Sequence, residues 1–240
     1  MNKSNRSRRR TRKGKNQKNQ AITAMEVSQP AAKAIVLSRA KPVLNGQAGS
    51  LRVRHHEILT TIVSTADKYT VRAINLIPSS CTWLKNVAVN FSKWRWLSLN
   101  IVYVPTCATS TPGDIDMALQ YDGNDTLAST PEELSVMNGH AGGPLWSGTA
   151  GCKLVGASIT NENSKPPQAI ATVVDVNKFP KRWYNYTSQN LTGDSITIYC
   201  PCDLQYGVTA GVTPAAGGIG RLWISYEIEL IEPIPAGLNK

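Results

Sequence analysis

The sequence lacks any apolar run long enough to cross a membrane. A single acid, Glu26, interrupts the only stretch that resembles the apolar core of a signal peptide. We therefore expect neither a membrane-spanning segment nor a secretion signal, and we expect no membrane partner.

Cysteine and histidine are too sparse for a convincing metal centre. The five cysteines include no Cys-x-x-Cys pair, and the three histidines do not complete a zinc set. We expect reduced cysteines that pack in the interior of a cytosolic protein. His55 and His56 are adjacent at the start of a predicted strand, so their side chains should point to opposite faces, which argues against a shared metal ion.

A catalytic set is also missing. The segment Gly139–Leu145 resembles the nucleophile loop of trypsin-like proteases, but Ala141 stands where the serine would be. Alanine has no hydroxyl for acyl transfer, so we interpret the segment as a glycine-rich loop. Since no acid–base pair, phosphate loop or cofactor motif is found, we predict a protein that is not an enzyme and has no small-molecule substrate.

Acidic residues are absent from the first twenty residues, which contain no apolar residue after Met1. This composition predicts an arm that is disordered in isolation. Its basic residues neutralise phosphates whatever the base sequence, and no aromatic residue is present to stack on bases. We therefore predict that the arm binds nucleic acid by charge, while a nuclear-localisation run or a transit peptide remains an alternative. The nine candidate binding residues are Lys3, Arg6, Arg8, Arg9, Arg10, Arg12, Lys13, Lys15 and Lys18.

The excess positive charge lies at one end of the chain. Residues 1–54 hold fourteen basic residues and one acid, a charge of +13, whereas residues 55–240 carry −3. Such asymmetry indicates a polyanionic partner. Between the arm and the body, residues 21–50 are rich in Ala, Pro, Gly, Val and Leu, and Pro30 and Pro42 exclude one long helix. We predict an arm and connector over 1–50 (1–20 disordered, 21–50 partly ordered) and a single folded domain over 51–240.

After Arg52 the pattern is typical of strands separated by turns. Alternation is clearest in two runs, where Ile115, Met117, Leu119 and Tyr121 share one face, as do Leu222, Ile224, Tyr226, Ile228 and Leu230. About eight strands with only short connecting helices predict an all-β sandwich or jelly roll. The predicted strands are Glu57–Ser64, Tyr69–Ile77, Trp94–Val104, Gly113–Tyr121, Ala169–Val176, Ser195–Cys200, Leu204–Val208 and Arg221–Ile231.

Two short helices are predicted in the connections. Ser80 could cap a helix with Trp83, Leu84, Val87, Ala88 and Phe91 on its apolar side. Thr130 should cap a second helix, because Pro131 and two acids follow it.

One turn has the composition of a weak cation site. Asp122-Gly123-Asn124-Asp125 follows a predicted strand, and two carboxylates three residues apart can face one hard cation such as calcium. Asp, Gly and Asn are also ordinary turn residues, so the spacing alone favours the structural interpretation. Two carboxylates are too few for a full coordination shell, and a subunit interface could supply the other ligands.

The stretch from Phe91 to Thr126 resembles the coat proteins of sobemoviruses, small icosahedral plant viruses. Their pattern is a tryptophan, an apolar strand that ends Tyr-x-Pro, a turn, Gly-x-Ile-x-Met, and an Asp-x-x-Asp turn. This chain has Trp94-Arg95-Trp96, Val102–Pro105, Gly113–Met117 and Asp122–Asp125 in that order. It departs from the pattern at Leu119, where an aromatic residue is usual, and residues 150–195 match no motif.

The resemblance implies an eight-stranded antiparallel jelly roll and a structural capsid protein. It implies self-assembly of about 180 copies into a T=3 icosahedral shell, with the arm packaging single-stranded viral RNA. It further implies structural Ca2+ between subunits, with Asp122 and Asp125 as ligands and Asn239 as a third. We therefore expect a virion protein, made and assembled in the host cytoplasm, whose Arg-rich arm could also direct nuclear entry.

A cellular RNA-binding or ribosome-associated protein with a basic tail is the alternative. It would explain the arm equally well. It would not predict a nearly neutral, Trp-rich body of this size, nor the ordered run from Tyr103 to Asp125.

Overall fold

The computed structural model describes residues 41–47, 49–63, 69–108, 110–146, 170–189, 191, 195–209 and 218–238. These residues form ten strands that are joined by short helices. The strands are β1 (Val43–Gln47), β2 (Ser50–Ile62), β3 (Thr70–Asn75), β4 (Phe91–Pro105), β5 (Asp114–Gln120), β6 (Asn138–Pro144), β7 (Ala171–Val173), β8 (Tyr184–Asn185), β9 (Asp203–Val208) and β10 (Gly220–Pro233). The helices are η1 (Pro78–Ser80), α1 (Leu84–Ala88), α2 (Pro131–Ser135), η2 (Val176–Lys178), α3 (Ser195–Tyr199) and η3 (Ala236–Leu238).

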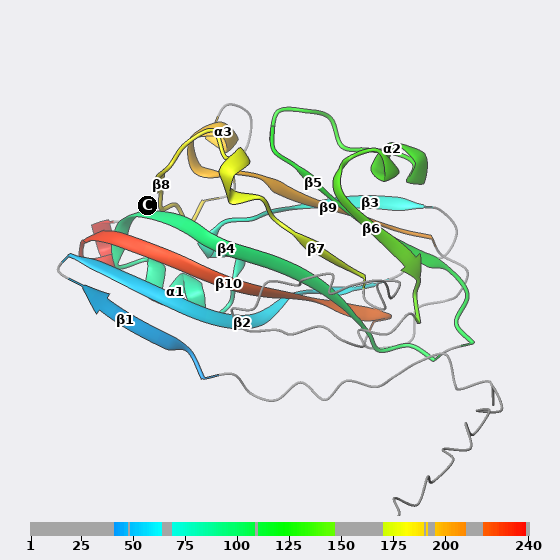
Figure 1. Cartoon of the computed structure of the whole chain (residues 1–240), viewed down its shortest axis with the longest axis horizontal. Helices are drawn as coiled ribbons and strands as arrows, with labels where there is room; N and C mark the ends of the chain where they lie inside the picture. Colours follow the sequence, from blue (N-terminus) through cyan, green and yellow to red (C-terminus); the bar gives the residue numbers. More distant parts are fainter. Residues whose placement is uncertain are drawn as a thin grey trace, which may run out of the picture. The chain divides into compact units, whose positions relative to one another are not determined.

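The strands form two antiparallel sheets (Figure 1). Side chains from both sheets contribute to one core. Sheet A has the order β1-β2-β10-β4-β7, with β8 also paired to β4, and sheet B has the order β3-β9-β5-β6. The last long strand, β10, lies between β2 and β4, so the two ends of the domain meet in one sheet. This is the predicted jelly-roll sandwich.

The core follows the alternation that the sequence predicts. All five inward residues of β10, from Leu222 to Leu230, are buried, as are Ile115, Met117 and Leu119 of β5. Two core tryptophans satisfy their indole groups with backbone acceptors, because Trp94 donates to Asn185 O (3.1 Å) and Trp96 donates to Leu76 O (2.9 Å). Burying these large rings is a main source of the stability of the sandwich.

Three predictions of local structure were wrong. Ser195–Cys200 was predicted as a strand because Ile, Thr and Tyr favour strands, but Ser195–Tyr199 is helix α3, with Cys200 N–H donating to Ile196 O (2.8 Å). The glycine-rich segment predicted as a loop is strand β6, because its backbone pairs with β5. Ser80 does not cap α1; its hydroxyl donates to Asn75 O (2.7 Å).

The second helix prediction is confirmed. Thr130 caps α2, and its hydroxyl accepts the N–H of Glu133 (3.3 Å). Pro131 occupies the first turn of the helix, as expected from its fixed φ.

The described cysteines are unpaired, as expected: Cys81, Cys200 and Cys202 are buried, and Cys107 is half-buried. Burial raises the pKa of the Cys200 and Cys202 thiols, which keeps them protonated. Cys152 lies outside the described residues. Within the described part of the chain, no helix is long and apolar enough to cross a membrane.

Candidate functional site

The Asp122–Asp125 turn projects from the end of β5 as a compact, hydrogen-bonded turn. The N–H of Asn124 donates to Asp122 Oδ1 (3.0 Å), and the N–H of Asp125 donates to Asp122 O (3.3 Å). Both aspartates are exposed, and no described basic side chain forms an ion pair with either. The turn therefore presents two carboxylates to solvent without a protein cation.

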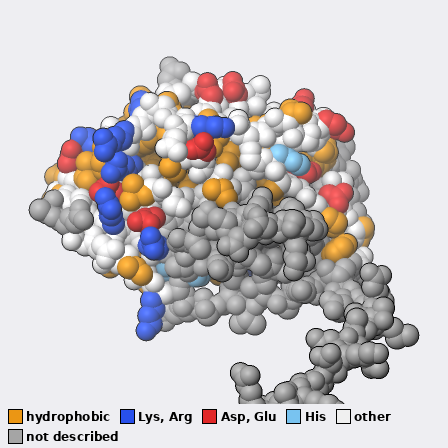
Figure 2. All heavy atoms as spheres, viewed as in Figure 1, with side chains coloured by type: hydrophobic (Ala, Val, Ile, Leu, Met, Phe, Trp, Pro, Cys, Tyr) orange, Lys and Arg blue, Asp and Glu red, His pale blue; other side chains and the backbone are white. Residues whose placement is uncertain are grey.

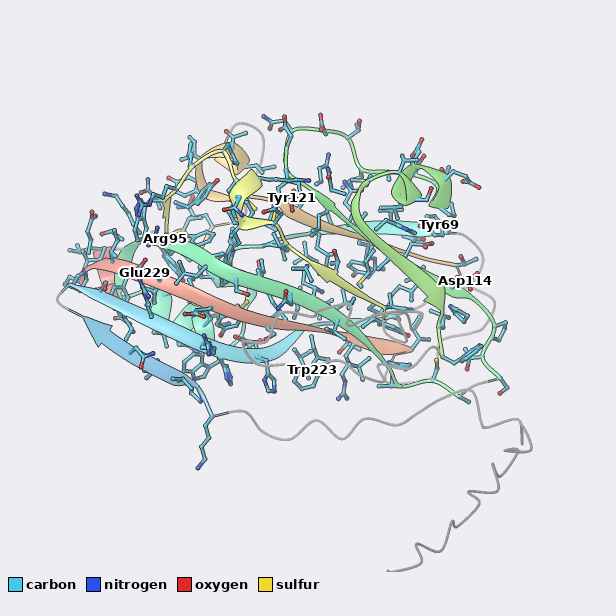
Figure 3. All side chains as sticks on the ribbon, in the orientation of Figure 1. Tyr69, Arg95, Asp114, Tyr121, Trp223 and Glu229 are labelled. Carbon is cyan, nitrogen blue, oxygen red and sulfur yellow. The ribbon has the colours of Figure 1, made fainter. Side chains whose placement is uncertain are left out.

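Contacts on both sides of Asp122 fix the position of the turn. The hydroxyl of Tyr121 accepts the N–H of Asp175 (2.9 Å), and Lys178 Nζ lies 5.5 Å from the centre of the Tyr121 ring. Gly123 packs against Ile196 of α3 so closely that a Cβ at this position would overlap Cγ2 of Ile196. The turn is consequently held against α3 and the segment before η2, where Figure 3 labels Tyr121.

The two aspartates fit part of a calcium site. They supply oxygen ligands of the type that calcium prefers, but calcium takes about six to eight oxygens. Among the described residues no group of three His, Cys, Asp or Glu side chains could hold a metal ion. Asn239, the third predicted ligand, lies outside those residues. A calcium ion at this turn would need further ligands, such as those a neighbouring subunit could bring.

All nine predicted RNA-binding residues of the arm, from Lys3 to Lys18, also lie outside the described residues. Four basic residues of the described domain, Arg52, Arg54, Lys93 and Arg95, lie instead on the outer face of sheet A beside acidic ones (Figure 2).

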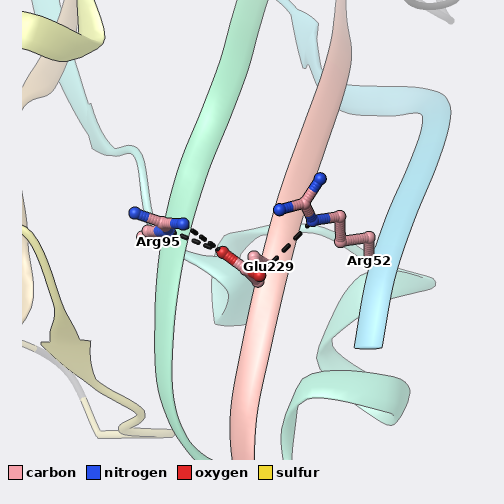
Figure 4. A network of polar contacts seen from close by, with 3 residues as sticks. All are labelled: Arg52, Arg95 and Glu229. Carbon is pink, nitrogen blue, oxygen red and sulfur yellow. Dashed lines mark hydrogen bonds and ion pairs between the residues drawn. The ribbon is translucent and has the colours of Figure 1, made fainter. Parts of the chain in front are cut away.

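These basic side chains are paired with acids across neighbouring strands. Glu229 of β10 lies between Arg52 of β2 (3.3 Å) and Arg95 of β4 (2.5 Å), as Figure 4 shows. The same pattern joins Arg54 to Glu227 (2.6 Å) and Lys93 to Glu232 (2.7 Å). Burial by itself would raise the pKa of Glu229. Hydrogen bonds and the positive charge from Arg95 and Arg52 outweigh this effect, so the pKa of Glu229 is lowered. The charges of this face therefore largely neutralise one another.

The segment that resembles a protease loop forms a different arrangement. His140 Nε2 lies 3.2 Å from Asp116 Oδ1, and the Tyr69 hydroxyl donates to Asp116 Oδ2 (3.4 Å). Gly142 lies beside Asp116, and a Cβ there would overlap the carboxylate. These contacts involve no serine or cysteine, so they provide no nucleophile for acyl transfer.

His55 and His56 have different surroundings, in line with the predicted opposite faces, although their ring centroids lie only 5.8 Å apart. His55 packs against Trp83 and Tyr226 on the core side, and His56 packs against Trp223. Burial lowers the pKa of His55.

Known proteins are similar to this chain in both sequence and fold. A sequence model of the viral coat protein (S domain) family matches residues 24–236. The chain is 34% identical over 218 residues to the capsid protein of Tobacco necrosis virus (strain A), covering 88% of this chain and 76% of that protein. It is 30% identical over 224 residues to that of strain D, covering 91% and 81% respectively.

A solved structure of Tobacco necrosis virus superposes on this chain with a TM-score of 0.75 at 33% identity, covering 88% of this chain and 95% of that one. A coat protein is not a cellular RNA-binding protein, so the alternative from the sequence is set aside. The family match over most of the chain, the relatives and the jelly-roll fold together establish that this chain belongs to the viral coat protein (S domain) family and is a structural, shell-forming protein of an icosahedral virion, not an enzyme.

Proposed function

We propose that this capsid protein packages single-stranded RNA through the charge of its N-terminal arm. The observation that carries the proposal is the contrast between the two parts of the chain. On the outer face of sheet A, Arg52, Arg54, Lys93 and Arg95 are each paired with a glutamate. Residues 1–20 hold nine basic residues and no acid. The arm therefore concentrates positive charge that no acid within its own sequence offsets, which suits it to neutralise phosphates.

Salt dependence tests the arm. Nine phosphate contacts to a single strand correspond to a slope of about −6 in log K against log salt. Deleting residues 1–20 should remove most of this slope and leave the circular dichroism of the shell domain unchanged. A matched variant that replaces the nine Lys and Arg residues by Gln keeps the length of the arm and should behave like the deletion. Unchanged RNA affinity and slope in both variants would reject the arm as the binding element.

We further propose a T=3 shell, because the arm charge suits about 180 copies. Residues 1–50 carry a charge of +11 in each subunit, leaving out Arg52 and Arg54 because glutamates pair with them. In about 180 copies this gives about 2,000 positive charges, which matches an RNA of a few thousand nucleotides. Residues 21–50 would act as the switch, since identical chains in unequal positions must differ somewhere. Deletion of residues 1–50 should favour a smaller shell in electron micrographs. Exclusive assembly into the large shell would contradict the switch.

Calcium binding between subunits is the third part of the proposal. Asp122 and Asp125 would supply carboxylate ligands, and Asn239 would contribute from near the chain end. Support comes from the exposed turn and from the narrower sobemovirus resemblance of Phe91–Thr126, which we retain as a proposal. Carboxylates that meet at an interface repel one another unless a cation or protons neutralise them.

Removal of calcium by a chelator tests this part of the proposal. Removing calcium above neutral pH should swell the particles or make them salt-labile, whereas at low pH protonation relieves the repulsion and the effect should be small. The variant Asp122→Asn/Asp125→Asn should assemble, bind less calcium and lose the chelator response. Wild-type particles that contain no calcium and ignore chelator at pH 8 would return the turn to a purely structural role.

A further inference from the structure

Between the ion-paired rows and Arg221, the outer face of sheet A has two rows without Lys, Arg, Asp or Glu. The strand registers align one row of residues across four strands: Ile58 of β2, Trp223 of β10, Val102 of β4 and Ala171 of β7. The neighbouring row on the same face consists of His56, Ser225, Asn100 and Val173. Figure 3 shows Trp223 well separated along the sheet from Arg95 and Glu229.

The row of Ile58, Trp223, Val102 and Ala171, here called the outer row, points away from the core. Residues that flank it in sequence, such as Ile101 and Leu222, belong to the core, and strand alternation places the outer row on the other face. None of its four members is part of either core cluster of the described chain. Val102 is nevertheless fully buried, and the other three are half-buried. An apolar row on the outside of a sandwich is typical of a docking surface.

The indole of Trp223 adds a polar requirement. Its Nε1 is buried and has no hydrogen-bond acceptor within the described part of the chain. A buried donor without an acceptor is unfavourable, so an occupant of this surface should bring an oxygen to the indole. The backbone carbonyl of an extended segment would serve.

The chain itself leads toward this surface. β1 pairs with β2 antiparallel, and Val43 lies opposite Arg54. Residues before Val43 are therefore directed toward the part of β2 that contains His56 and Ile58. The preceding segment, Ala31–Leu37, reads Ala-Ala-Lys-Ala-Ile-Val-Leu and carries a single charge.

We infer that residues 31–37 of the connector dock on the outer row of the same subunit. The six residues from Leu37 to Val43 span about 20 Å when extended, and four adjacent strands span about 14 Å, so the segment can reach the whole row. Its apolar side chains cover the outer row, and one of its carbonyls accepts the Trp223 N–H. Docking gives the connector switch of the proposed function a surface, but the docking does not depend on RNA packaging.

Trypsin provides the test, because Lys33 and Arg39 lie within and just after the segment and Lys18 lies in the arm. The experiment uses dilute, RNA-free, full-length subunits with mass-spectrometric detection of the cleavage sites. Docking should make cleavage after Lys33 and Arg39 about tenfold slower than cleavage after Lys18, since proteolysis tracks the population of the open state.

Two variants remove the contact from opposite sides. Ile35→Asp/Leu37→Asp lies outside the shell domain, so it tests the segment even if Trp223→Gln fails to fold. Each should raise cleavage after Lys33 about tenfold, and combining them should add little. Val136→Asp, at a site that is 85% exposed elsewhere on the domain, is the control and should leave cleavage unchanged.

Cleavage after Lys33 as fast as after Lys18 in the wild-type protein overturns the inference. So does protection that appears only after RNA is added, or only at high protein concentration, because the occupant is then RNA or a second copy. The salt slope of RNA binding, measured on the same variants, tests RNA packaging by the arm separately. Docking and RNA packaging can therefore fail independently. If the segment docks, Ile35→Asp/Leu37→Asp should raise the rate of cleavage after Lys33 about tenfold. The same variant should change the salt slope of RNA binding only slightly, because it adds just two acids to each arm.

Discussion

Glu57 offers a sharp test of how buried polar contacts hold the shell domain together. Its side chain is buried on β2, where it accepts three hydrogen bonds. The donors are the N–H groups of Trp83 (2.6 Å) and Leu84 (3.3 Å), which begin α1, and the hydroxyl of Tyr226 (2.8 Å). One carboxylate thus fastens the start of α1 to β2 and β10.

Glu57→Gln keeps the size of the side chain but turns one oxygen into a nitrogen donor. At least one of the three buried donors must then lose its acceptor. Because a hydrogen bond to a charged group contributes about 1.5–3 kcal/mol, we expect a loss of about 2–4 kcal/mol in the free energy of unfolding. Tyr226→Phe removes one bond and should cost about 1–2 kcal/mol.

Urea unfolding of dissociated, RNA-free subunits, followed by circular dichroism, measures these changes. The double variant should be more stable than the sum of the single effects indicates, by about 1 kcal/mol, because both changes remove the same bond. Glu132→Gln on the exposed side of α2 is the control and should stay within about 0.5 kcal/mol of wild type. A Glu57→Gln effect as small as that of the control, or strict additivity with Tyr226→Phe, would refute the reasoning.

Further predictions follow from the charges and the close packing. The pKa of Glu229 is lowered, so its ion pairs stabilise the fold above about pH 4.5, and this stabilisation is lost as pH falls. Glu229→Gln should therefore lower the free energy of unfolding by about 1 kcal/mol at pH 7. It should also make that free energy depend less on pH in the acid range. Burial raises the pKa of Tyr226, and the charge of Glu57 adds to this, so above about pH 10 this tyrosine ionises only in the unfolded chain. The free energy of unfolding should then fall by about 1.4 kcal/mol per pH unit because of this residue. Urea unfolding at several alkaline pH values should show that Tyr226→Phe removes this contribution. Gly142→Ala should displace Asp116 and lower the melting temperature, whereas Gly46→Ala, where a Cβ meets nothing within 4 Å, should not.

The alternation of apolar and polar residues predicted most of the sandwich, because in a strand with one buried face every second side chain is buried. The inward residues of β5 and β10 could be identified in the sequence, since each strand has one apolar face. The cap at Thr130 was equally local, because its signal lies within four residues. Local signals failed where distant contacts decide. Ile196 favours a strand by propensity, yet it forms a helical turn packed on Gly123, and β6 is a strand because β5 pairs with its glycines.

The candidate sites divide in the same way. The sequence identified the Asp122–Asp125 turn, because the two proposed ligands are close together in the chain. It also identified the charge of the arm, because net charge follows from composition and does not depend on the fold. It missed the outer row, because Ile58, Val102 and Trp223 come from strands far apart in sequence and only the register aligns them. The alternation of β10 offered a signal, because Trp223 stands among Arg221, Ser225 and Glu227 on the face opposite the core.

The sequence by itself therefore determined the all-β class, the basic arm and the family resemblance, all of which depend on composition or on residues close together in the chain. The tertiary structure decided which charges are neutralised and which apolar residues remain outside the core. Arg52, Arg95 and Glu229 are far apart in sequence and become an ion-paired group only because β10 inserts between β2 and β4. That insertion joins the two ends of the domain, and no local pattern encodes it, because pairing between distant strands is a property of the whole fold.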